Sequence, residues 1–447
     1  MLNQLLPNFT ISIMLYQITR FIIGIALRIY YKRIDIRNIH NLQTTGPSII
    51  ISNHPNTLMD ALLLGYMSRQ EVYFLAKATL FNTKLKLWML QKMHMIPINR
   101  PGEGKIEGVQ NTDSFEACFK VLEQGKRILI FPEGSSFKER VLRQLKTGAA
   151  RIALDFEKKY DGKMGIVIIP VGINYSDAER FQSSILVSVG APILASDFLD
   201  AYRADFVNTS RDLTKIFRLR LEELLITSHD EQEDKLFDVL REILASKYLL
   251  KEKDDFGFLT ELKNALTKIR VSDPLKYQEL IKLAYEIKWK SEKVAIRADF
   301  ADRRFRSVMF LRQILFSIIG LFIAFPVFLY GFLHNGLQYQ LTDKLILRNT
   351  KEVEYYAPLA VLIGILLYPL TYIGFIVLLH QFVHIPWWGK IIYYASLPIS
   401  GLLAYYIYKY YTHVSFKWNY FLLMFNRRES LLDIKSKRDE LRKLLFD

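Results

Sequence analysis

The amino-acid sequence predicts an α/β domain with a mixed sheet flanked by helices, followed by a helical extension and C-terminal transmembrane helices. Between residues 35 and 194, short β-branched runs alternate with helical patterns, which is typical of a sheet covered by helices. From 195 to 307 these strand signals fade, and charged helical patterns with regularly spaced leucines replace them. Segment 308–411 holds uncharged apolar runs, and a basic tail follows at 412–447. Residues 1–34 stand before the α/β domain as a separate segment.

The segment 1–34 is expected to form an amphipathic helix associated with a membrane. It is largely apolar, but Gln17, Arg20, Gly24 and Arg28 recur at helical spacing and give the helix one polar stripe. Such a helix lies in the membrane interface, and a tilted span whose arginines reach the headgroups is the alternative. No basic region precedes the helix and no small-residue cleavage site follows it, so we expect no cleaved signal peptide.

Six strands are predicted in the α/β domain. They lie near residues 47–52, 72–75, 93–98, 127–131, 165–171 and 184–189. Several of these strands are followed at once by polar residues, glycine or proline, and the ends of the strands are where open α/β sheets bind ligands. The strand ends are therefore the place to look for a site.

A histidine and an aspartate mark the end of the first of these strands. His54 follows the buried run Ile49–Ile51, and Asp60 stands six positions later, on the first turn of the next helix. We expect the Asp60 carboxylate to accept the imidazole N–H, and a histidine held in this way can take a proton from a hydroxyl group. The pattern supplies no serine or cysteine nucleophile, so the nucleophile is expected to be a substrate hydroxyl. The alternative is an ordinary structural histidine at a strand end.

Three further blocks follow His54 in a fixed order, and the first of them has two parts, Phe74–Lys77 and Ile96–Arg100. They are Phe74-Leu75-Ala76-Lys77 with Ile96-Pro97-Ile98-Asn99-Arg100, Phe131-Pro132-Glu133-Gly134 and Ile169-Pro170-Val171. Over residues 35 to 190 this ordered set resembles the glycerophospholipid acyltransferase family, which includes glycerol-3-phosphate and 1-acylglycerol-3-phosphate acyltransferases.

Two features depart from the usual pattern of that family. Four residues usually separate the histidine from the aspartate, whereas five separate His54 from Asp60, and this longer spacing resembles a glycerol-3-phosphate acyltransferase branch. Ser135 stands where threonine is usual, and Ser136 where arginine or serine is common.

The resemblance implies that His54 is the general base of an acyl transfer. It would take the proton from a glycerol hydroxyl, which attacks the thioester carbonyl of a fatty acyl donor, while Asp60 fixes the tautomer and stabilises the imidazolium. No acyl-enzyme, metal or cofactor is implied. The donor, acyl-CoA or acyl carrier protein, stays open. The acceptor is glycerol-3-phosphate or 1-acylglycerol-3-phosphate, with a slight preference for the former.

The resemblance also implies which residues bind the acceptor. Arg100 is suited to a bidentate contact with its phosphate, and Glu133 would orient Arg100 or bind an acceptor hydroxyl. Gly134 would let a backbone N–H approach the anion, and Ser135 would add a hydroxyl donor. Lys146 is a second candidate phosphate contact, with helix capping by its segment as the alternative.

Pro170 is expected to shape the acyl-donor end of the pocket. The single cysteine, Cys118, excludes an intramolecular disulfide and is expected in the core. The histidines outside the motif lack metal-ligand spacing, so no metal site is predicted.

The composition favours a membrane partner. The chain has 447 residues, of which 51% are hydrophobic, and its net charge is +15. Such a balance suits nucleic acid or anionic membrane lipids, and no zinc-finger or RNA-binding signature is present. We therefore expect anionic lipids and no nucleic acid. The alternative function is a catalytically silent, membrane-anchored protein on the same fold that binds anionic lipids.

Segment 308–411 is predicted to cross the membrane two or three times. Its uncharged runs are 314–333, 357–379 and 391–408, and Trp387 and Trp388 mark an interface between the last two. Basic residues before the first run place the catalytic side in the cytoplasm. They are Arg303, Arg304, Arg306 and Arg312. Three spans would put the basic tail outside, so either one run is re-entrant or the tail is translocated.

Overall fold

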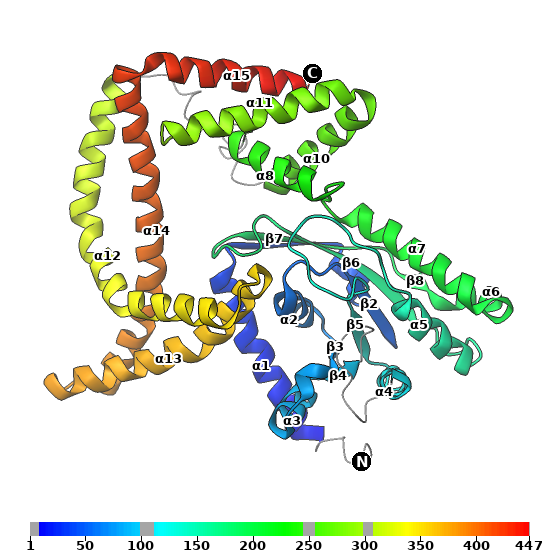
Figure 1. Cartoon of the computed structure of the whole chain (residues 1–447). Helices are drawn as coiled ribbons and strands as arrows, with labels where there is room; N and C mark the ends of the chain where they lie inside the picture. The colour runs from blue at the N-terminus through cyan, green and yellow to red at the C-terminus, as the bar shows by residue number, and fades with distance from the viewer. Residues whose placement is uncertain (1–8, 99–110, 245–254, 298–306, 447) are drawn as a thin grey trace. The chain divides into compact units, whose positions relative to one another are not determined.

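The computed structural model describes residues 9–98, 111–244, 255–297 and 307–446 (Figure 1). By compactness the chain divides into two units. The first comprises Met1–Thr227 together with Glu352–Val361, and the second comprises Ser228–Lys351 and Leu362–Asp447.

The first unit is built on an eight-stranded mixed sheet. Its strands are β1 Arg33–Arg37, β2 Ser48–Ser52, β3 Val72–Lys77, β4 Met95–Ile98, β5 Arg127–Ile130, β6 Val167–Tyr175, β7 Ser184–Val189 and β8 Ile193–Leu194. They lie in the order β1-β7-β6-β2-β5-β3-β4, with β8 paired to β6. The five central strands run parallel, whereas β7 and β8 are antiparallel to β6, and β1 is parallel to β7. The predicted mixed sheet and its six strands are confirmed.

Helices cover this sheet. They are α1 Phe9–Tyr30, α2 Thr57–Met67, α3 Lys84–Lys92, α4 Asn111–Glu123, α5 Gly148–Lys159, α6 Leu199–Ala204 and α7 Phe206–Leu224, with the short 3-10 turns η2 Ile39–Leu42, η3 Ala78–Phe81, η4 Ala195–Phe198 and η6 Val353–Tyr355. Parallel strands buried on both faces need continuous apolar runs, and all five residues of β2 are buried.

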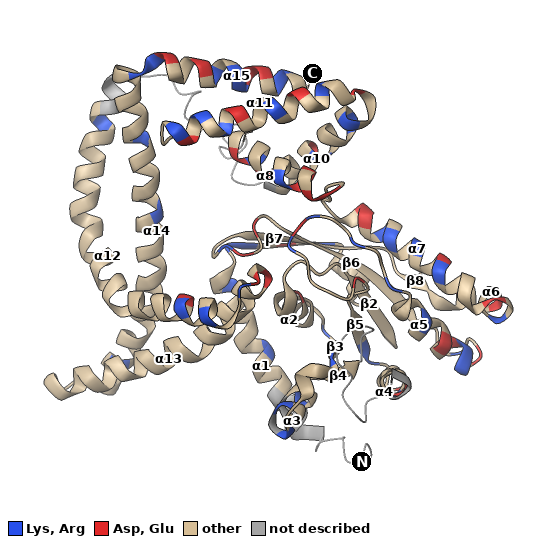
Figure 2. Cartoon of the chain, in the orientation of Figure 1, with Lys and Arg blue, Asp and Glu red and all other residues tan. Residues whose placement is uncertain are grey.

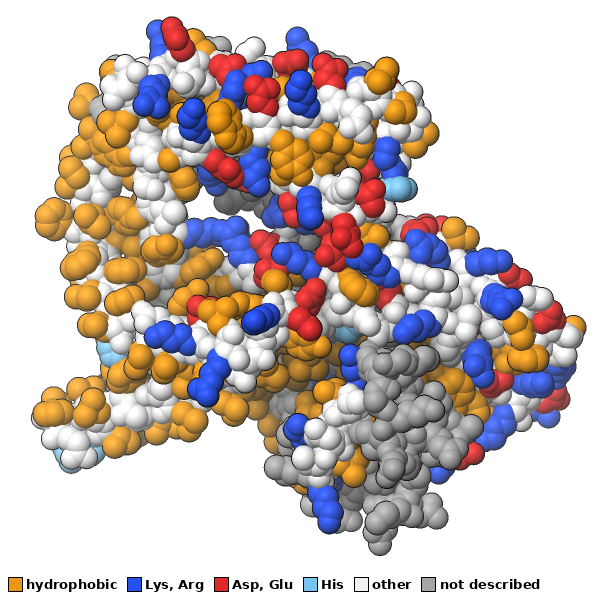
Figure 3. Space-filling model, viewed as in Figure 1, with side chains coloured by type: hydrophobic (Ala, Val, Ile, Leu, Met, Phe, Trp, Pro, Cys, Tyr) orange, Lys and Arg blue, Asp and Glu red, His pale blue; other side chains and the backbone are white. Residues whose placement is uncertain are grey.

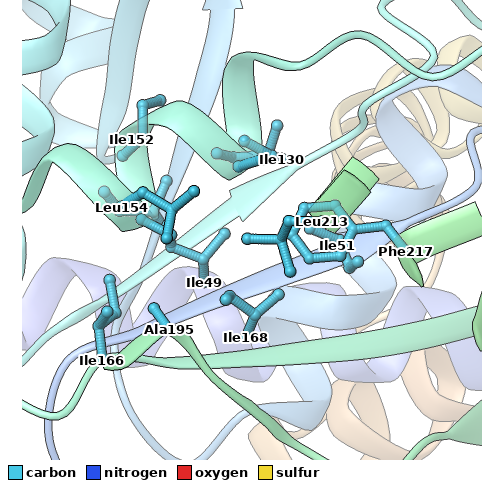
Figure 4. Close-up of a cluster of buried hydrophobic side chains, with 14 of the residues drawn as sticks. Ile49, Ile51, Ile130, Ile152, Leu154, Ile166, Ile168, Ala195, Leu213 and Phe217 are labelled. Carbon is cyan, nitrogen blue, oxygen red and sulfur yellow. The ribbon is translucent and has the colours of Figure 1, made fainter. Parts of the chain in front are cut away.

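The main core lies between the central strands and helices α5 and α7. Ile49 and Ile51 of β2 meet Ile152 of α5 and Leu213 and Phe217 of α7 (Figure 4). Because α7 buries its apolar face here, the compact unit reaches Thr227, beyond the predicted boundary of the α/β domain at residue 194.

Cys118 of α4 is fully buried in the same core, as expected. Burial raises the pKa of its thiol to about 12, so it stays protonated. The cysteine is a small core residue rather than a nucleophile.

Arg20, Gly24 and Arg28 of the polar stripe on α1 contact Tyr66, whereas Gln17 of the same stripe is exposed. The guanidinium of Arg20 donates to the backbone carbonyl of Tyr66 in α2 at 3.0 and 3.2 Å, and Arg28 donates to the Tyr66 hydroxyl at 2.9 Å. Gly24 lies against the ring of Tyr66, where a Cβ would clash. Apolar residues face outward instead, with Phe21 69% exposed. The arginines of the predicted stripe therefore fix α1 on α2, and the exposed apolar face suits the membrane interface.

The second unit is entirely helical in its described parts. Its helices are α8 Glu231–Leu244, α10 Asp255–Ser272, α11 Pro274–Lys293, α12 Ser307–Asn349, α13 Tyr356–Phe382, α14 Trp387–Asn426 and α15 Arg428–Phe446, and α13 starts in the first unit. Helices α8, α10, α11 and α15 pack together. Lys290 of α11 pairs with Asp433 of α15 at 2.5 Å, and Lys437 of α15 with Glu286 of α11 at 3.1 Å. Figure 2 shows charges of both signs along these helices.

Helices α12, α13 and α14 are long and apolar enough, by length and composition, to cross a membrane. Apolar side chains cover the visible outer face of α12 and α14 (Figure 3). The two helices pack antiparallel. Near the start of α12, Lys417 Nζ of α14 donates to Gln313 Oε1 at 3.1 Å. Further along α12, Asn335 Nδ2 donates to the carbonyl of Leu397, which comes earlier in α14, at 3.2 Å. The predicted apolar C-terminal helices are therefore present.

Candidate active site

The structure brings His54 and Asp60 together. His54 follows β2, and its Nδ1 lies 2.9 Å from Oδ2 of Asp60. The backbone N–H of Asn56 donates to the same oxygen at 2.8 Å. Asp60 is fully buried, whereas the side chain of His54 keeps 15% of its surface exposed. The longer interval between the two residues is taken up by the turn before α2, so Asp60 on the first helical turn still faces the ring.

A tyrosine that the sequence did not predict holds the other oxygen of Asp60. The hydroxyl of Tyr175, at the end of β6, donates to Oδ1 at 2.7 Å. Burial raises the pKa of Tyr175 well above its usual value, and the charge of Asp60 raises it further. The hydroxyl therefore stays protonated as a donor. Both carboxylate oxygens are engaged, so the carboxylate has one orientation, with Oδ2 toward His54.

The His54 ring is also fixed on one face. Phe131, which follows β5, stacks on it with ring centroids 3.8 Å apart and planes within 6°. Because β2 and β5 are parallel neighbours, their ends meet at the same edge of the sheet. With Nδ1 donating to Asp60, Nε2 is the nitrogen left to accept a proton.

Glu133 ties the loop after β5 to the histidine turn. Its Oε1 accepts the backbone N–H of His54 at 3.1 Å, and Oε2 accepts that of Arg143 at 3.0 Å. Burial raises the pKa of Glu133, while these two N–H groups act in the opposite direction. Arg100, the predicted partner of Glu133, lies outside the described residues, as does Asn99.

Ser136 braces the same turn, a contact that the sequence did not predict. Its hydroxyl donates to the carbonyl of His54 at 2.8 Å and accepts the backbone N–H of Thr57 at 2.9 Å. The turn from His54 to Thr57 is thus held at both ends by the loop after β5.

Gly134 and Lys146 lie next to each other at this edge. Gly134 has φ +78°, and a Cβ there would lie only 2.5 Å from Lys146 Nζ. Only glycine fits this backbone without strain, and its position lets the exposed ammonium lie over the loop. Ser135, the next residue, is half-buried. The arrangement places one positive charge beside the loop in which the acceptor phosphate is predicted to bind.

An apolar pocket of about 260 Å³ lies along α2. Its wall is mainly apolar and comes from α1, α2, α3, β3 and the segment around β4. It includes Ile23, Leu58, Ala61, Leu62, Gly65, Phe74, Trp88, Met93 and Met95, with Arg20 and Lys92 among its polar members. Leu58, in the first turn of α2, is the lining residue nearest to His54 in the sequence, and His54 itself does not line the pocket.

Pro170 does not line this pocket. It lies within β6 in register with Ile51 of β2, and its carbonyl accepts the N–H of Gly190 at 2.8 Å. Its part in shaping an acyl pocket stays a prediction.

Comparisons with known proteins match this part of the chain. Residues 33–174 fit the family model described as Acyltransferase. The chain is 26% identical over 149 residues to a chloroplastic 1-acyl-sn-glycerol-3-phosphate acyltransferase of Arabidopsis thaliana, covering 33% of this chain and 37% of that protein. It is 27% identical over 167 residues to the 1-acyl-sn-glycerol-3-phosphate acyltransferase of Bacillus subtilis, covering 37% of this chain and 76% of that protein.

A third relative matches over a longer stretch. Glycerol-3-phosphate O-acyltransferase 2 of Saccharomyces cerevisiae is 22% identical over 293 residues, covering 61% of this chain and 39% of that protein. The chain thus spans under two fifths of the plant and yeast relatives.

Proposed function

We propose that residues 33–174, which match the family model described as Acyltransferase, form an acyltransferase domain of the glycerophospholipid type, and that the chain moves a fatty acyl group from a thioester to a glycerophosphate hydroxyl. The observation that supports this activity most directly is the His54–Asp60 pair, with Tyr175 on the second carboxylate oxygen. A histidine held in this way is a general base, and no nucleophilic side chain is needed.

The proposed reaction needs only this chain's residues and two substrates. Nε2 of His54 takes the proton of the acceptor hydroxyl as its oxygen attacks the thioester carbonyl. Asp60 stabilises the imidazolium. The C–S bond then breaks, and the thiolate leaves with the proton that His54 carried. No metal or cofactor takes part, and the donor is acyl-CoA or acyl carrier protein.

Glycerol-3-phosphate is the acceptor we favour over 1-acylglycerol-3-phosphate. The match to the yeast glycerol-3-phosphate acyltransferase extends well beyond the acyltransferase domain, and the five-residue spacing between His54 and Asp60 agrees with that branch. Arg100, Lys146 and the Gly134–Ser135 loop would hold the phosphate, with Glu133 bracing this loop.

The apolar pocket along α2 is proposed to take the acyl chain. Its wall is mainly apolar, which suits a hydrocarbon chain, and it includes Leu58 in the first turn of α2, the helix that follows the His54 turn. A chain entering along α2 would keep its thioester carbonyl near the histidine turn.

We propose that the protein is embedded in a membrane, with its active site on the cytoplasmic face. The three long apolar helices support the first part, and the basic residues before α12 support the second. Anionic lipids would bind the basic surface, and nucleic acid is not an expected partner.

The silent lipid-binding alternative is not favoured. A protein that only binds lipid has no need of a buried carboxylate that two further donors, the Asn56 N–H and the Tyr175 hydroxyl, hold against a partly exposed histidine. The test is an acyl-transfer assay of the full-length protein in membranes, offering each acceptor with each donor. Esterified product in at least one pairing is expected, and the absence of product in all four pairings would overturn the proposal.

Ala61→Phe should shift the acyl preference toward short chains. Ala61 lines the pocket, so a phenyl ring there would fill part of its volume. We expect the ratio of kcat/KM for palmitoyl over decanoyl donors to fall by about tenfold or more. Leu62→Ala, which enlarges the same pocket, is the matched control and should not lower that ratio. An unchanged ratio in Ala61→Phe would place the acyl chain elsewhere.

Lys146→Gln should raise the acceptor KM by about tenfold, because a charge-assisted contact with phosphate is lost. The donor KM should stay unchanged. Lys215→Gln removes an exposed lysine of α7, which pairs with Asp212 at 2.8 Å, and serves as the control. A rise in the donor KM alone would assign Lys146 to the wrong substrate.

A further inference from the structure

Thr57 closes the histidine turn in an uncommon backbone conformation. Its φ is +39°, in the left-handed region that β-branched residues rarely adopt. The residue is 7% exposed and is the first residue of α2, three positions after His54. A conformation of this kind persists only where the surroundings hold it, and such residues gather at active sites.

Two hydrogen bonds hold Thr57. Its backbone N–H donates to the Ser136 hydroxyl at 2.9 Å, and Ser136 in turn donates to the carbonyl of His54. Its own hydroxyl donates to the backbone carbonyl of Glu354 at 3.0 Å. The first bond comes from the loop after β5, whereas the second comes from a part of the chain 297 positions away.

The segment that supplies this carbonyl is Glu352–Val361. It belongs to the first unit, and its turn η6 packs against α2. Ala357 is fully buried and Val361 is 5% exposed. In the sequence, however, the segment joins α12 to α13, two of the three helices apolar enough to cross a membrane.

We propose that Thr57 is a positioning residue of the acyl transfer and that the segment Glu352–Val361 acts on His54 through it. This inference rests on the proposed function. Thr57 is proposed to act through the backbone: its hydroxyl bonds the Glu354 carbonyl and so fixes the turn whose other end carries the general base. The segment Glu352–Val361, which connects α12 to α13, is thereby part of the catalytic unit. A shift of this segment would move His54 away from the position in which it can take the proton.

Thr57→Val tests the hydroxyl. Valine has nearly the same shape and the same backbone restriction, so the variant removes the bond to Glu354 and little else. In the full-length protein we expect kcat to fall about tenfold or more with both KM values little changed, because a small misplacement of a catalytic group is costly. Thr57→Ser keeps the hydroxyl and should retain wild-type kcat. Glu354→Gln changes only the side chain and should retain it as well.

Tyr355→Pro tests the same bond from the other side. Proline biases the preceding residue toward an extended backbone and so redirects the carbonyl of Glu354, and it also removes the bond from the Tyr355 N–H to the Glu352 carbonyl within the same turn. If both changes act on one bond, the double variant Thr57→Val/Tyr355→Pro should be no slower than the slower single variant. Either single variant suffices for the test if the other fails to fold.

Hydrogen–deuterium exchange gives a readout that needs no turnover. Thr57→Val should speed exchange in peptides covering 54–58 and also in those covering 352–361. Wild-type kcat in Thr57→Val, equal losses in Thr57→Ser, or unchanged exchange in 352–361 would each overturn the inference. A wild-type protein without acyl transfer would overturn the proposed function instead, and the exchange result would still show whether the segment is coupled to the turn.

Discussion

His54→Ala should abolish acyl transfer while leaving expression and membrane association intact. Positioned proton transfer supplies about 10²–10⁴-fold in rate, and no other described histidine contacts Asp60. The loss should appear in kcat for every acceptor and donor that the wild-type protein uses. The measurement is the initial rate of ester formation at saturating substrates.

A second histidine–aspartate pair in the chain provides the matched control. His229 Nδ1 lies 3.2 Å from Asp230 Oδ2, but both side chains are more than half exposed and belong to the second unit. His229→Ala should therefore leave kcat unchanged. Wild-type turnover from purified His54→Ala would refute the mechanism.

Asp60→Asn should cost less than His54→Ala, about 10–10²-fold in kcat. The environment of Asp60 explains the difference. An amide can point its oxygen toward the His54 N–H and the Asn56 N–H, and its NH₂ toward the oxygen of the Tyr175 hydroxyl. The ring then keeps its tautomer, and only the charge that stabilises the imidazolium is lost. In serine proteases the same substitution costs more because the tautomer changes.

Asp230→Asn is the control for this variant, and it should have no effect on kcat. A loss in Asp60→Asn as large as that in His54→Ala would mean that the amide does not adopt this orientation. Adding Tyr175→Phe removes the group that selects the orientation, so the double variant should be slower than Asp60→Asn alone.

Three of the six strands that the sequence predicted stand out by their apolar runs. β2, β5 and β6 are rich in isoleucine, leucine and valine, as expected for strands that are buried on both faces. β1 was missed because its sequence, Arg-Ile-Asp-Ile-Arg, alternates charge with isoleucine and pairs only with β7 at the sheet edge. β8 has two residues, too few for any pattern.

The candidate site divides in the same way between local and distant parts. His54 and Asp60 are near neighbours in the sequence, so their spacing predicted their meeting. Tyr175 reaches Asp60 only because β6 pairs in parallel with β2, with Val171 in register with Ser52. Glu354 reaches Thr57 from beyond α12. These two contacts join residues more than a hundred positions apart in the chain. No local sequence pattern predicts them, because they depend on how the strands and segments pair in the fold.

The packing of α15 on α11 bears on how the chain threads the bilayer. Helix α11 comes before the three apolar helices and α15 after them, yet ion pairs and buried leucines join the two into one charged, water-facing body. One body cannot stand on both sides of a membrane at once. We infer that the chain returns to the face from which it left, so the number of crossings between Lys293 and Arg428 is even. With three candidate helices, two at most cross, and the third enters and leaves by the same face or lies along it. The basic tail then lies on the same side of the membrane as Arg312. The preference of basic residues for the cytoplasm and the number of spans then agree.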